Sequence, residues 1–202
     1  MGKAYTDEEK QQIRNELLEA GLALFHDSGI QNISIRDLTS KVGIAQGGFY
    51  NFFPDKDTFI SEIVYYRTKQ KLLLFEESFP LSIKDPVSYV SNAIFSGSWD
   101  LKQKADQKQV YADTLKLYVD RRFSNKERIY AALYDSFEHL ANYWQQQSLL
   151  ITMDISGIMN VIKGALILYT NLEQLDRAYT ESLIRTFIYE NCRNYIIGGY
   201  TS

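Results

Sequence analysis

The sequence predicts an all-α protein of about nine helices. Apolar residues recur every three or four positions through nearly the whole chain, and a serine, threonine or aspartate begins most of these segments. Only three prolines occur in 202 residues, and no stretch has the pattern of a convincing strand. With 45% hydrophobic residues, the chain can fill one or two cores. We expect a small three-helix domain in residues 1–54 and a larger helical domain in residues 55–202.

Residues 34–59 predict two helices joined by a tight turn, and then the start of a third. Ser34 and Asp37 have the spacing of a capping box, and apolar residues follow on one helical face. Gly43 stands where a chain leaving a helix needs a left-handed residue. The next helix, over residues 45–51, is too short to be stable alone, so the phenylalanines in and after it must anchor it.

The other helices are predicted from their caps and apolar stripes. Thr6 with Glu9, and Ser124 with Glu127, have capping-box spacing. A long helix that begins after Asp55 joins the two domains. The remaining predicted helices cover about residues 7–28, 56–78, 86–97, 105–122, 125–147, 155–171 and 177–197.

The string SIRDLTSKVGIAQGGFYNFFPDKDTF, residues 34–59, resembles the recurring motif of the tetracycline-repressor (TetR) family of bacterial transcription regulators. The match is almost residue for residue and extends into the preceding helix, whereas the rest of the chain is similar only in length and helical architecture. One departure is Thr39, where the family usually has alanine. The resemblance implies a helix-turn-helix domain that binds double-stranded operator DNA and a ligand-binding and dimerisation domain behind it. It also implies repression that a small-molecule inducer relieves.

Two side chains are candidates for reading bases. The planar fork of Arg36 can take guanine O6 and N7 together, and Gln46 can pair with adenine through two hydrogen bonds. Lys56, in the first turn of the long helix, adds a cation to free backbone N–H groups and so predicts a phosphate site. The other expected DNA contacts bind phosphate, reach a base edge or let the backbone approach closely: Ser34, Gly47, Gly48, Tyr50 and Asn51.

The charge balance argues against strong nonspecific DNA binding. Residues 1–60 contain six basic and nine acidic side chains, a net charge of −3, and the remaining 142 residues carry 16 of each. Nonspecific affinity comes from phosphate neutralisation, so this domain must rely on a few well-placed cations. The acidic balance keeps an alternative open, a helical dimer that binds a ligand or a protein partner and does not bind DNA.

The last two helices carry more apolar surface than one helical face can use. Residues 155–169 are apolar nearly all round but short for a bilayer, so we expect a buried helix and not a membrane span. Helix-turn-helix proteins usually read DNA as two-fold dimers, and the TetR family builds its dimer from two such helices of each chain. A monomer with an apolar core is the alternative. The expected homodimer contacts are Ile158, Val161, Ala165, Leu168, Ile184, Phe187, Ile188 and Tyr195.

Large aromatic residues are frequent in the middle helices. They either fill a core or enclose an apolar cavity with a few polar groups. The family resemblance implies a small-molecule inducer there, and we expect a largely hydrophobic or aromatic ligand. Its binding would move the long helix after Asp55, the only element expected to join the pocket to the DNA-binding domain. The candidate pocket residues are Phe95, Trp99, Tyr118, Phe137 and Trp144.

Catalysis, metal binding and a cofactor are not expected. His26 and His139 are far apart in the sequence, and neither has a second ligand at helical spacing. Cys192 lies in an apolar stripe without a nearby base, which favours a small buried residue. A single cysteine excludes an internal disulfide, and the absence of an N-terminal apolar run favours a cytoplasmic protein without a signal peptide.

Overall fold

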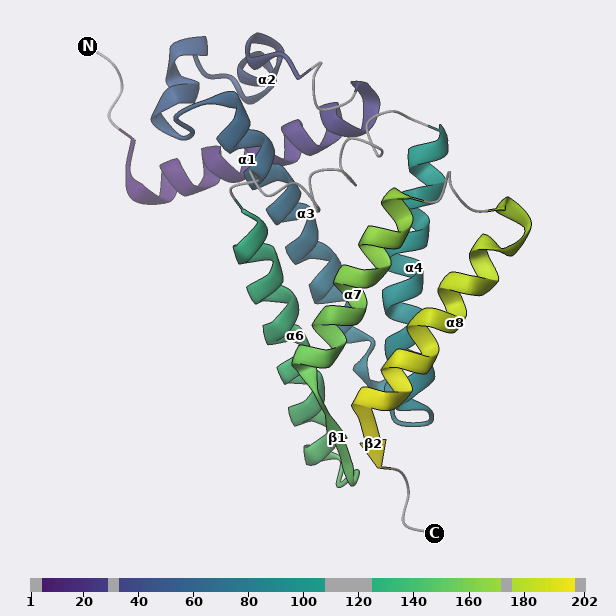
Figure 1. Ribbon diagram of the computed structural model, residues 1–202. Helices are drawn as coiled ribbons and strands as arrows, with labels where there is room; N and C mark the ends of the chain where they lie inside the picture. The colour runs from purple at the N-terminus through teal and green to yellow at the C-terminus, as the bar shows by residue number, and fades with distance from the viewer. Residues whose placement is uncertain (1–4, 29–32, 108–124, 172–175, 199–202) are drawn as a thin grey trace.

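The computed structural model describes residues 5–28, 33–107, 125–171 and 176–198, and in this part of the chain the predicted helical architecture is confirmed. The elements in chain order are α1 (Asp7–Ser28), α2 (Ile35–Val42), the 3₁₀ helix η1 (Gln46–Asn51), α3 (Lys56–Glu77), η2 (Phe79–Ser82), α4 (Pro86–Gln107), α6 (Lys126–Gln146), β1 (Ile151–Met153), α7 (Ile155–Thr170), α8 (Arg177–Tyr195) and β2 (Ile196–Gly198). Figure 1 shows α1, α2 and η1 gathered at one end of the molecule. The long helix α3 leads from this end into the group formed by α4, α6, α7 and α8.

The starts of α1, α2 and α3 are capped by the residues that the sequence predicts, whereas the N-cap of α6 is Asn125, which makes no side-chain capping bond. The Glu9 N–H donates to Thr6 Oγ1 at 3.1 Å, and the Thr6 N–H donates to Glu9 Oε2 at 2.9 Å. Ser34 Oγ accepts from the Asp37 N–H at 3.2 Å. Asp55 Oδ1 accepts the N–H three residues further along at 2.6 Å. Each bond satisfies a backbone donor that the first turn of a helix leaves free.

Two of the predicted helices differ from the structure. The segment 46–51 is a 3₁₀ helix whose hydrogen bonds run three residues back, where an α-helix was expected. Helix α4 continues through Gly97, its expected end, to Gln107. One glycine costs about 1 kcal/mol in a helix interior, which is too little to end a long helix. Ser124 and most of the predicted helix 105–122 lie outside the described residues.

The expectation that the chain contains no strand is wrong for β1 and β2. These two strands pair in an antiparallel manner, with Met153 opposite Ile196. Three residues are too few to show the alternation that identifies a strand in a sequence. The Asp154 N–H also donates to the Tyr195 carbonyl at 2.8 Å. The start of α7 is therefore fixed against the end of α8.

The N-terminal core is built on three phenylalanines. Phe49, Phe53 and Phe59 are at most 1% exposed, and their ring centroids lie 4.8 to 5.5 Å apart. Helix α1 crosses this cluster at Gly21, where a Cβ atom would lie only 2.5 Å from the Phe59 ring. The first turns of α3 therefore pack with α1 and η1.

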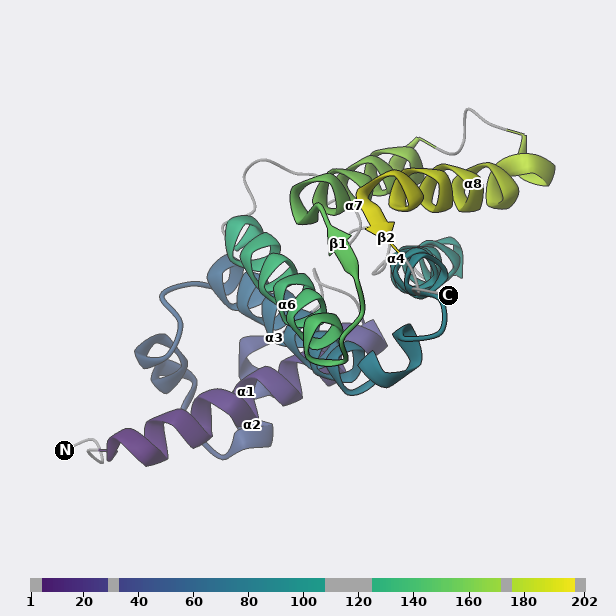
Figure 2. The ribbon, with the colours of Figure 1, turned by 90° about the horizontal axis from the view of Figure 1, so that it is seen from below.

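The C-terminal helices form a bundle in which α7 and α8 lie side by side. Figure 2 shows this pair on one side of the bundle, facing α4, with α6 and α3 further along. Two glycines of α7 allow the close approach of α8. A Cβ atom on Gly157 would lie 2.3 Å from the Tyr195 ring, and one on Gly164 would lie 2.8 Å from the Phe187 ring.

Candidate nucleic-acid interface and ligand pocket

The turn between α2 and η1 has the left-handed glycine that the sequence predicts. Gly43 has φ 76° and ψ 26°, a conformation that costs glycine little and other residues more. The next N–H, of Ile44, donates to the Thr39 carbonyl at 3.0 Å and closes the end of α2. Thr39 itself is 2% exposed, and its hydroxyl donates to the Ile35 carbonyl at 2.9 Å. Threonine therefore replaces the usual alanine without leaving a buried hydroxyl unpaired.

Element η1 presents a polar surface on an aromatic support. Phe49 points into the core, and the outer side carries Gln46, Gly47 and Asn51, all of which are exposed. Tyr50 is 54% exposed, and its ring meets the edge of the Phe49 ring at a centroid distance of 5.4 Å. Because Phe49 fixes the segment from below, the outer side chains project from a defined position.

The candidate cations lie on both sides of η1 along the chain. Arg36 is exposed on the first turn of α2, and Lys56 is partly buried on the first turn of α3. Ser34 is partly exposed as the N-cap of α2, and its hydroxyl hydrogen remains able to donate because Oγ accepts the Asp37 N–H. Gly48 is partly covered by Ile44, whose side chain lies 3.8 Å from where a Cβ would be.

Several of the acidic residues in this domain have local roles. Glu9 and Asp55 cap helices, and the Asp55 pKa is lowered because its carboxylate accepts the Thr58 backbone N–H. Asp7 pairs with Lys10 at 3.1 Å on an exposed turn of α1. These carboxylates stabilise helix N-termini, which accounts for part of the acidic balance of residues 1–60.

Sequence reasoning did not single out Arg14, which holds the end of η1. Its Nη1 donates to the Phe52 carbonyl at 2.9 Å, and its guanidinium lies 4.4 Å from the centroid of the Phe53 ring. Its Nη2 donates to Glu62 Oε2, also at 2.9 Å. The sequence could have indicated this role, because Arg14 lies between Ile13 and the inward-facing apolar positions of α1. A cation on that face needs a carboxylate or carbonyl partner.

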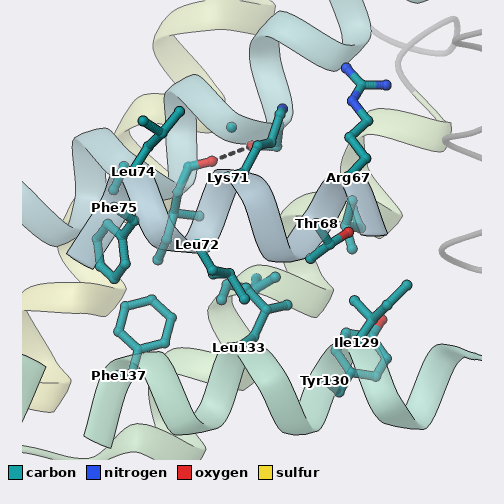
Figure 3. Close-up of a pocket in the computed structure, with 16 residues that line it drawn as sticks. Arg67, Thr68, Lys71, Leu72, Leu74, Phe75, Ile129, Tyr130, Leu133 and Phe137 are labelled. Atoms are coloured by element: carbon teal, nitrogen blue, oxygen red, sulfur yellow. Dashed lines mark hydrogen bonds between the residues drawn. The ribbon is translucent and has the colours of Figure 1, made fainter. Parts of the chain in front are cut away.

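An apolar cavity with a volume of about 390 Å³ lies between α3, α4, α6 and α7. Figure 3 shows Phe75 of α3 and Phe137 of α6 facing one another across it, with Leu133 beside them and Arg67 directed away from α6. The Phe75 and Phe137 ring centroids are 5.5 Å apart. The hydroxyl of Thr68 in the wall donates to a backbone carbonyl of its own helix at 2.9 Å. The lining is therefore largely apolar, with Arg67 and Lys71 as its charged members.

Of the pocket residues expected from the sequence, the structure brings Phe137 to this cavity and places two others elsewhere. Phe95 is 4% exposed, and the Arg185 guanidinium lies 3.7 Å from its ring centroid, in a separate hollow between α4 and α8. Trp144 is fully buried, and its Nε1–H donates to Ser82 Oγ at 2.7 Å. The sequence predicts both side chains at the pocket because they are large aromatics of the middle helices, but in the structure they contact Arg185 of α8 and Ser82 of η2. Tyr118 lies outside the described residues, as does the side chain of Trp99.

The residues expected at a dimer interface lie mostly inside the chain. Side chains with 0–3% exposure have almost no surface to offer a partner, and this corrects the choice of Ile158, Val161, Ala165, Ile184 and Ile188. They pack between α7, α8 and α4. Leu168, Phe187 and Tyr195 are partly exposed. The exposed apolar surface of α7 and α8 comes instead from Ile167 (58%), Tyr179 (70%), Leu183 (44%) and Tyr189 (39%).

Within the described residues, no three His, Cys, Asp or Glu side chains are grouped as metal ligands would be. His139 Nδ1 lies 3.0 Å from Glu76 Oε1, and Ser136 donates to the same oxygen at 2.7 Å. The serine is thus bonded to the carboxylate, whereas a catalytic serine must donate to the imidazole. No helix in the described part of the chain is long and apolar enough to cross a membrane.

The comparisons with known sequences match the N-terminal region. Residues 17–63 match the family model described as "Bacterial regulatory proteins, tetR family". The HTH-type transcriptional regulator AcrR of Shigella flexneri is 33% identical over 58 residues, which is 29% of this chain and 27% of that protein. The similarity to this relative is therefore confined to about a quarter of its length.

The comparisons with solved structures cover nearly the whole chain. The structure of RolR in complex with resorcinol has a TM-score of 0.65 at 14% identity and covers 94% of this chain and 90% of that one. A TetR-family regulator from Pectobacterium atrosepticum has a TM-score of 0.65 at 15% identity, with coverages of 97% and 100%. FadR of Thermus thermophilus in complex with lauroyl-CoA has a TM-score of 0.58 at 15% identity, with coverages of 89% and 91%. At these identities the similarity shows a shared fold, and the similarity to the tetR family model is confined to residues 17–63.

Proposed function

We propose that this chain is a transcriptional repressor that binds a palindromic operator as a homodimer and is released by a small, largely hydrophobic or aromatic ligand. The observation that carries the proposal is the exposed polar side of η1, fixed on the phenylalanine cluster after the left-handed turn at Gly43. A short helical element with a polar outer side and a rigid base suits the major groove.

Specific binding would rest on few contacts. Gln46 and Arg36, both exposed, are the proposed base readers, while Tyr50 and Lys56 hold phosphates. A Cβ atom on Gly47 would meet nothing within 4 Å, so the backbone there can approach the duplex closely. Ser34, Gly48 and Asn51 complete the proposed surface.

The proposed dimer uses the outer side of α7 and α8. Ile167, Tyr179 and Leu183 are large apolar side chains that are 44–70% exposed, with Leu168 and Phe187 partly exposed beside them. A patch of this kind on neighbouring helices is typical of an interface. Two-fold pairing would place the η1 elements on successive half-sites, about 34 Å apart or a multiple of that distance.

The proposed ligand site is the cavity between α3, α4, α6 and α7. Its volume of about 390 Å³ and its apolar wall are within the range of small-molecule sites. The similarly folded RolR and FadR structures hold resorcinol and lauroyl-CoA. Both ligands carry an apolar or aromatic part, which supports a ligand of that class for this chain.

The DNA proposal is tested by fluorescence anisotropy on duplexes from the region upstream of the gene, measured over a range of salt concentrations. We expect Gln46→Ala to reduce the preference for the operator over scrambled DNA. We expect Lys56→Ala to weaken all sequences equally and to reduce the salt slope by about one. Gln145→Ala, an exposed glutamine at the far end of α6, is the matched control. If no duplex binds even at low salt, the alternative of a helical dimer without DNA binding, which the net charge of −3 in residues 1–60 favours, replaces this proposal.

The dimer proposal has a separate test by sedimentation velocity. Leu183→Glu places a charge in the apolar patch and should shift the protein to monomers. Leu81→Glu, at a 74% exposed position on η2, should leave the oligomeric state unchanged. A dimer that survives Leu183→Glu, or a wild-type protein that is monomeric, contradicts the proposed interface.

A further inference from the structure

Glu62 of α3 is a largely buried carboxylate that binds side chains from two other helices. Its side chain is 12% exposed, and its Oε2 accepts Arg14 Nη2 of α1 at 2.9 Å. Its Oε1 accepts Asn125 Nδ2 at 3.0 Å and also the Nη1 of Arg128. One carboxylate therefore joins α1, α3 and the beginning of α6.

We call Glu62, Arg14, Asn125 and Arg128 the Glu62 cluster. On the α1 side, this cluster contacts the proposed DNA-contacting element directly. The same Arg14 guanidinium that binds Glu62 donates to the Phe52 carbonyl at 2.9 Å and covers the Phe53 ring. Phe52 caps the end of η1, where its N–H donates to the Phe49 carbonyl at 3.0 Å. The position of Arg14 therefore influences the last turn of η1.

On the other side, the cluster fixes the start of the helix that lines the cavity. Asn125 is the N-cap residue of α6 and is 6% exposed, and its Oδ1 accepts Arg128 Nη1 at 3.0 Å. The Arg128 guanidinium also lies 4.1 Å from the centroid of the Tyr65 ring on α3. The next residues of α6, beginning with Ile129, line the cavity. A displacement of α6 by a ligand would therefore pull directly on the bonds to Glu62.

We propose that Glu62 is a positioning residue that transmits the state of the cavity to η1 through Arg14, and this rests on the function proposed above. The sequence suggested α3 as the only connection between pocket and DNA-binding element, whereas the side chains of Asn125 and Arg128 supply a second one from α6. Because the connection depends on charge, the bond between Glu62 and Arg14 should respond to a change at Arg128. Two arginines share one carboxylate, so a change at Arg128 alters how strongly Glu62 holds Arg14.

The pKa of Glu62 is consistent with this arrangement. Burial by itself raises the pKa, but the hydrogen bonds from Asn125 and Arg128 and the charges of Arg128 and Arg14 outweigh it, and the net pKa is lowered. The carboxylate is thus ionised at neutral pH and holds its partners with charge-assisted hydrogen bonds.

The first test measures backbone hydrogen exchange in Arg128→Met, which keeps an unbranched apolar side chain and removes the guanidinium with its charge and hydrogen bonds. We expect the amides of Gly48, Phe52 and Phe53 to exchange roughly tenfold faster than in the wild type, because Glu62 is no longer fixed by Arg128 and therefore holds Arg14 less firmly. Glu127→Gln, an exposed neighbour on the same turn of α6, should leave these amides unchanged. A purely local role of Arg128 would alter exchange in α6 alone, and that result overturns the proposal. This test needs no DNA and no ligand.

The second test fills the cavity from within, since the natural ligand is unidentified. Leu133→Trp adds a ring in the cavity wall, and DNA affinity is compared in the wild type, Leu133→Trp, Glu62→Gln and the double variant, a cycle that isolates coupling. We expect Leu133→Trp to change the Kd severalfold with Glu62 present and to have little effect in the Glu62→Gln background. The proposal is overturned if Leu133→Trp changes the Kd for DNA by the same factor with Glu62 present and in the Glu62→Gln background, or if it changes the Kd in neither background. Faster exchange in Arg128→Met without DNA binding by any form leaves the coupling intact and refutes the DNA-binding function instead.

Discussion

Replacing Gly21 and Gly97 by alanine makes the same chemical change in the interior of two 22-residue helices, α1 and α4. Alanine is more favourable than glycine in a helix by about 1 kcal/mol, mainly because glycine loses more freedom on folding. The surroundings of the two positions differ. A Cβ atom at Gly97 meets nothing within 4 Å, whereas one at Gly21 lies 2.5 Å from Phe59 Cζ and 2.8 Å from Ile63 Cδ1.

The clash at Gly21 cannot be relieved cheaply. Phe59 and Ile63 are both fully buried, and the Phe59 ring is held between those of Phe49 and Phe53. Overpacking a rigid core costs about 2–3 kcal/mol at the upper end of the usual range. After subtraction of the helix gain of about 1 kcal/mol, Gly21→Ala should lower the free energy of unfolding by about 1–2 kcal/mol. Gly97→Ala should raise it by up to about 1 kcal/mol.

The measurement is urea unfolding followed by circular dichroism, at one protein concentration for all three proteins so that any association contributes equally. The two variants should have midpoints on opposite sides of the wild type, with similar slopes. If Gly21→Ala is as stable as the wild type, then α1 and α3 can separate at little cost, and the account of a rigid base beneath η1 fails.

Three further predictions concern buried polar groups. Trp144→Phe removes the donor to Ser82 Oγ and should cost about 1–3 kcal/mol in urea unfolding, and a second change, Ser82→Ala, should recover part of the loss; strict additivity of the two losses would contradict the hydrogen bond. Burial raises the pKa of the Cys192 thiol to about 12, so Ellman's reagent should react with it only after unfolding, and rapid reaction of the native protein would contradict its burial. The folded pKa of Glu62 is lowered, so its contribution to stability is complete above about pH 4.3 and is lost as the pH falls through the folded pKa. The stability difference between the wild type and Glu62→Gln should accordingly shrink in acid, and a difference that is constant from neutral pH to about pH 2 would show that Glu62 is not held by its partners in the folded state.

The features that the sequence predicted well depend on neighbouring residues. Ser34, Asp55 and Asp154 cap their helices through bonds that span three residues, so the relevant partner is visible in the sequence. The left-handed turn at Gly43 is similarly local. The features that were missed join distant residues, as when Trp144 binds Ser82 across 62 positions.

The faces of the C-terminal helices show the same limit. Helix α7 is apolar nearly all round, so its periodicity does not say which side meets α8 and which stays exposed. The structure buries Val161 and Ala165 and leaves Ile167 outside. The choice is made by the contacts of Gly157 and Gly164 with rings of α8, which no pattern within α7 reveals.

The sequence by itself determined the helical fold, most of the helix caps and the helix-turn-helix motif of residues 34–59, because each of these depends on interactions between residues a few positions apart. The tertiary structure decided which aromatic side chains line the cavity, which apolar residues remain exposed on α7 and α8, and how Glu62 joins Arg14 to Arg128. These outcomes depend on which helices pack together and on the rotation of each helix about its own axis. Both are decided by how well the side chains of facing helices pack against one another.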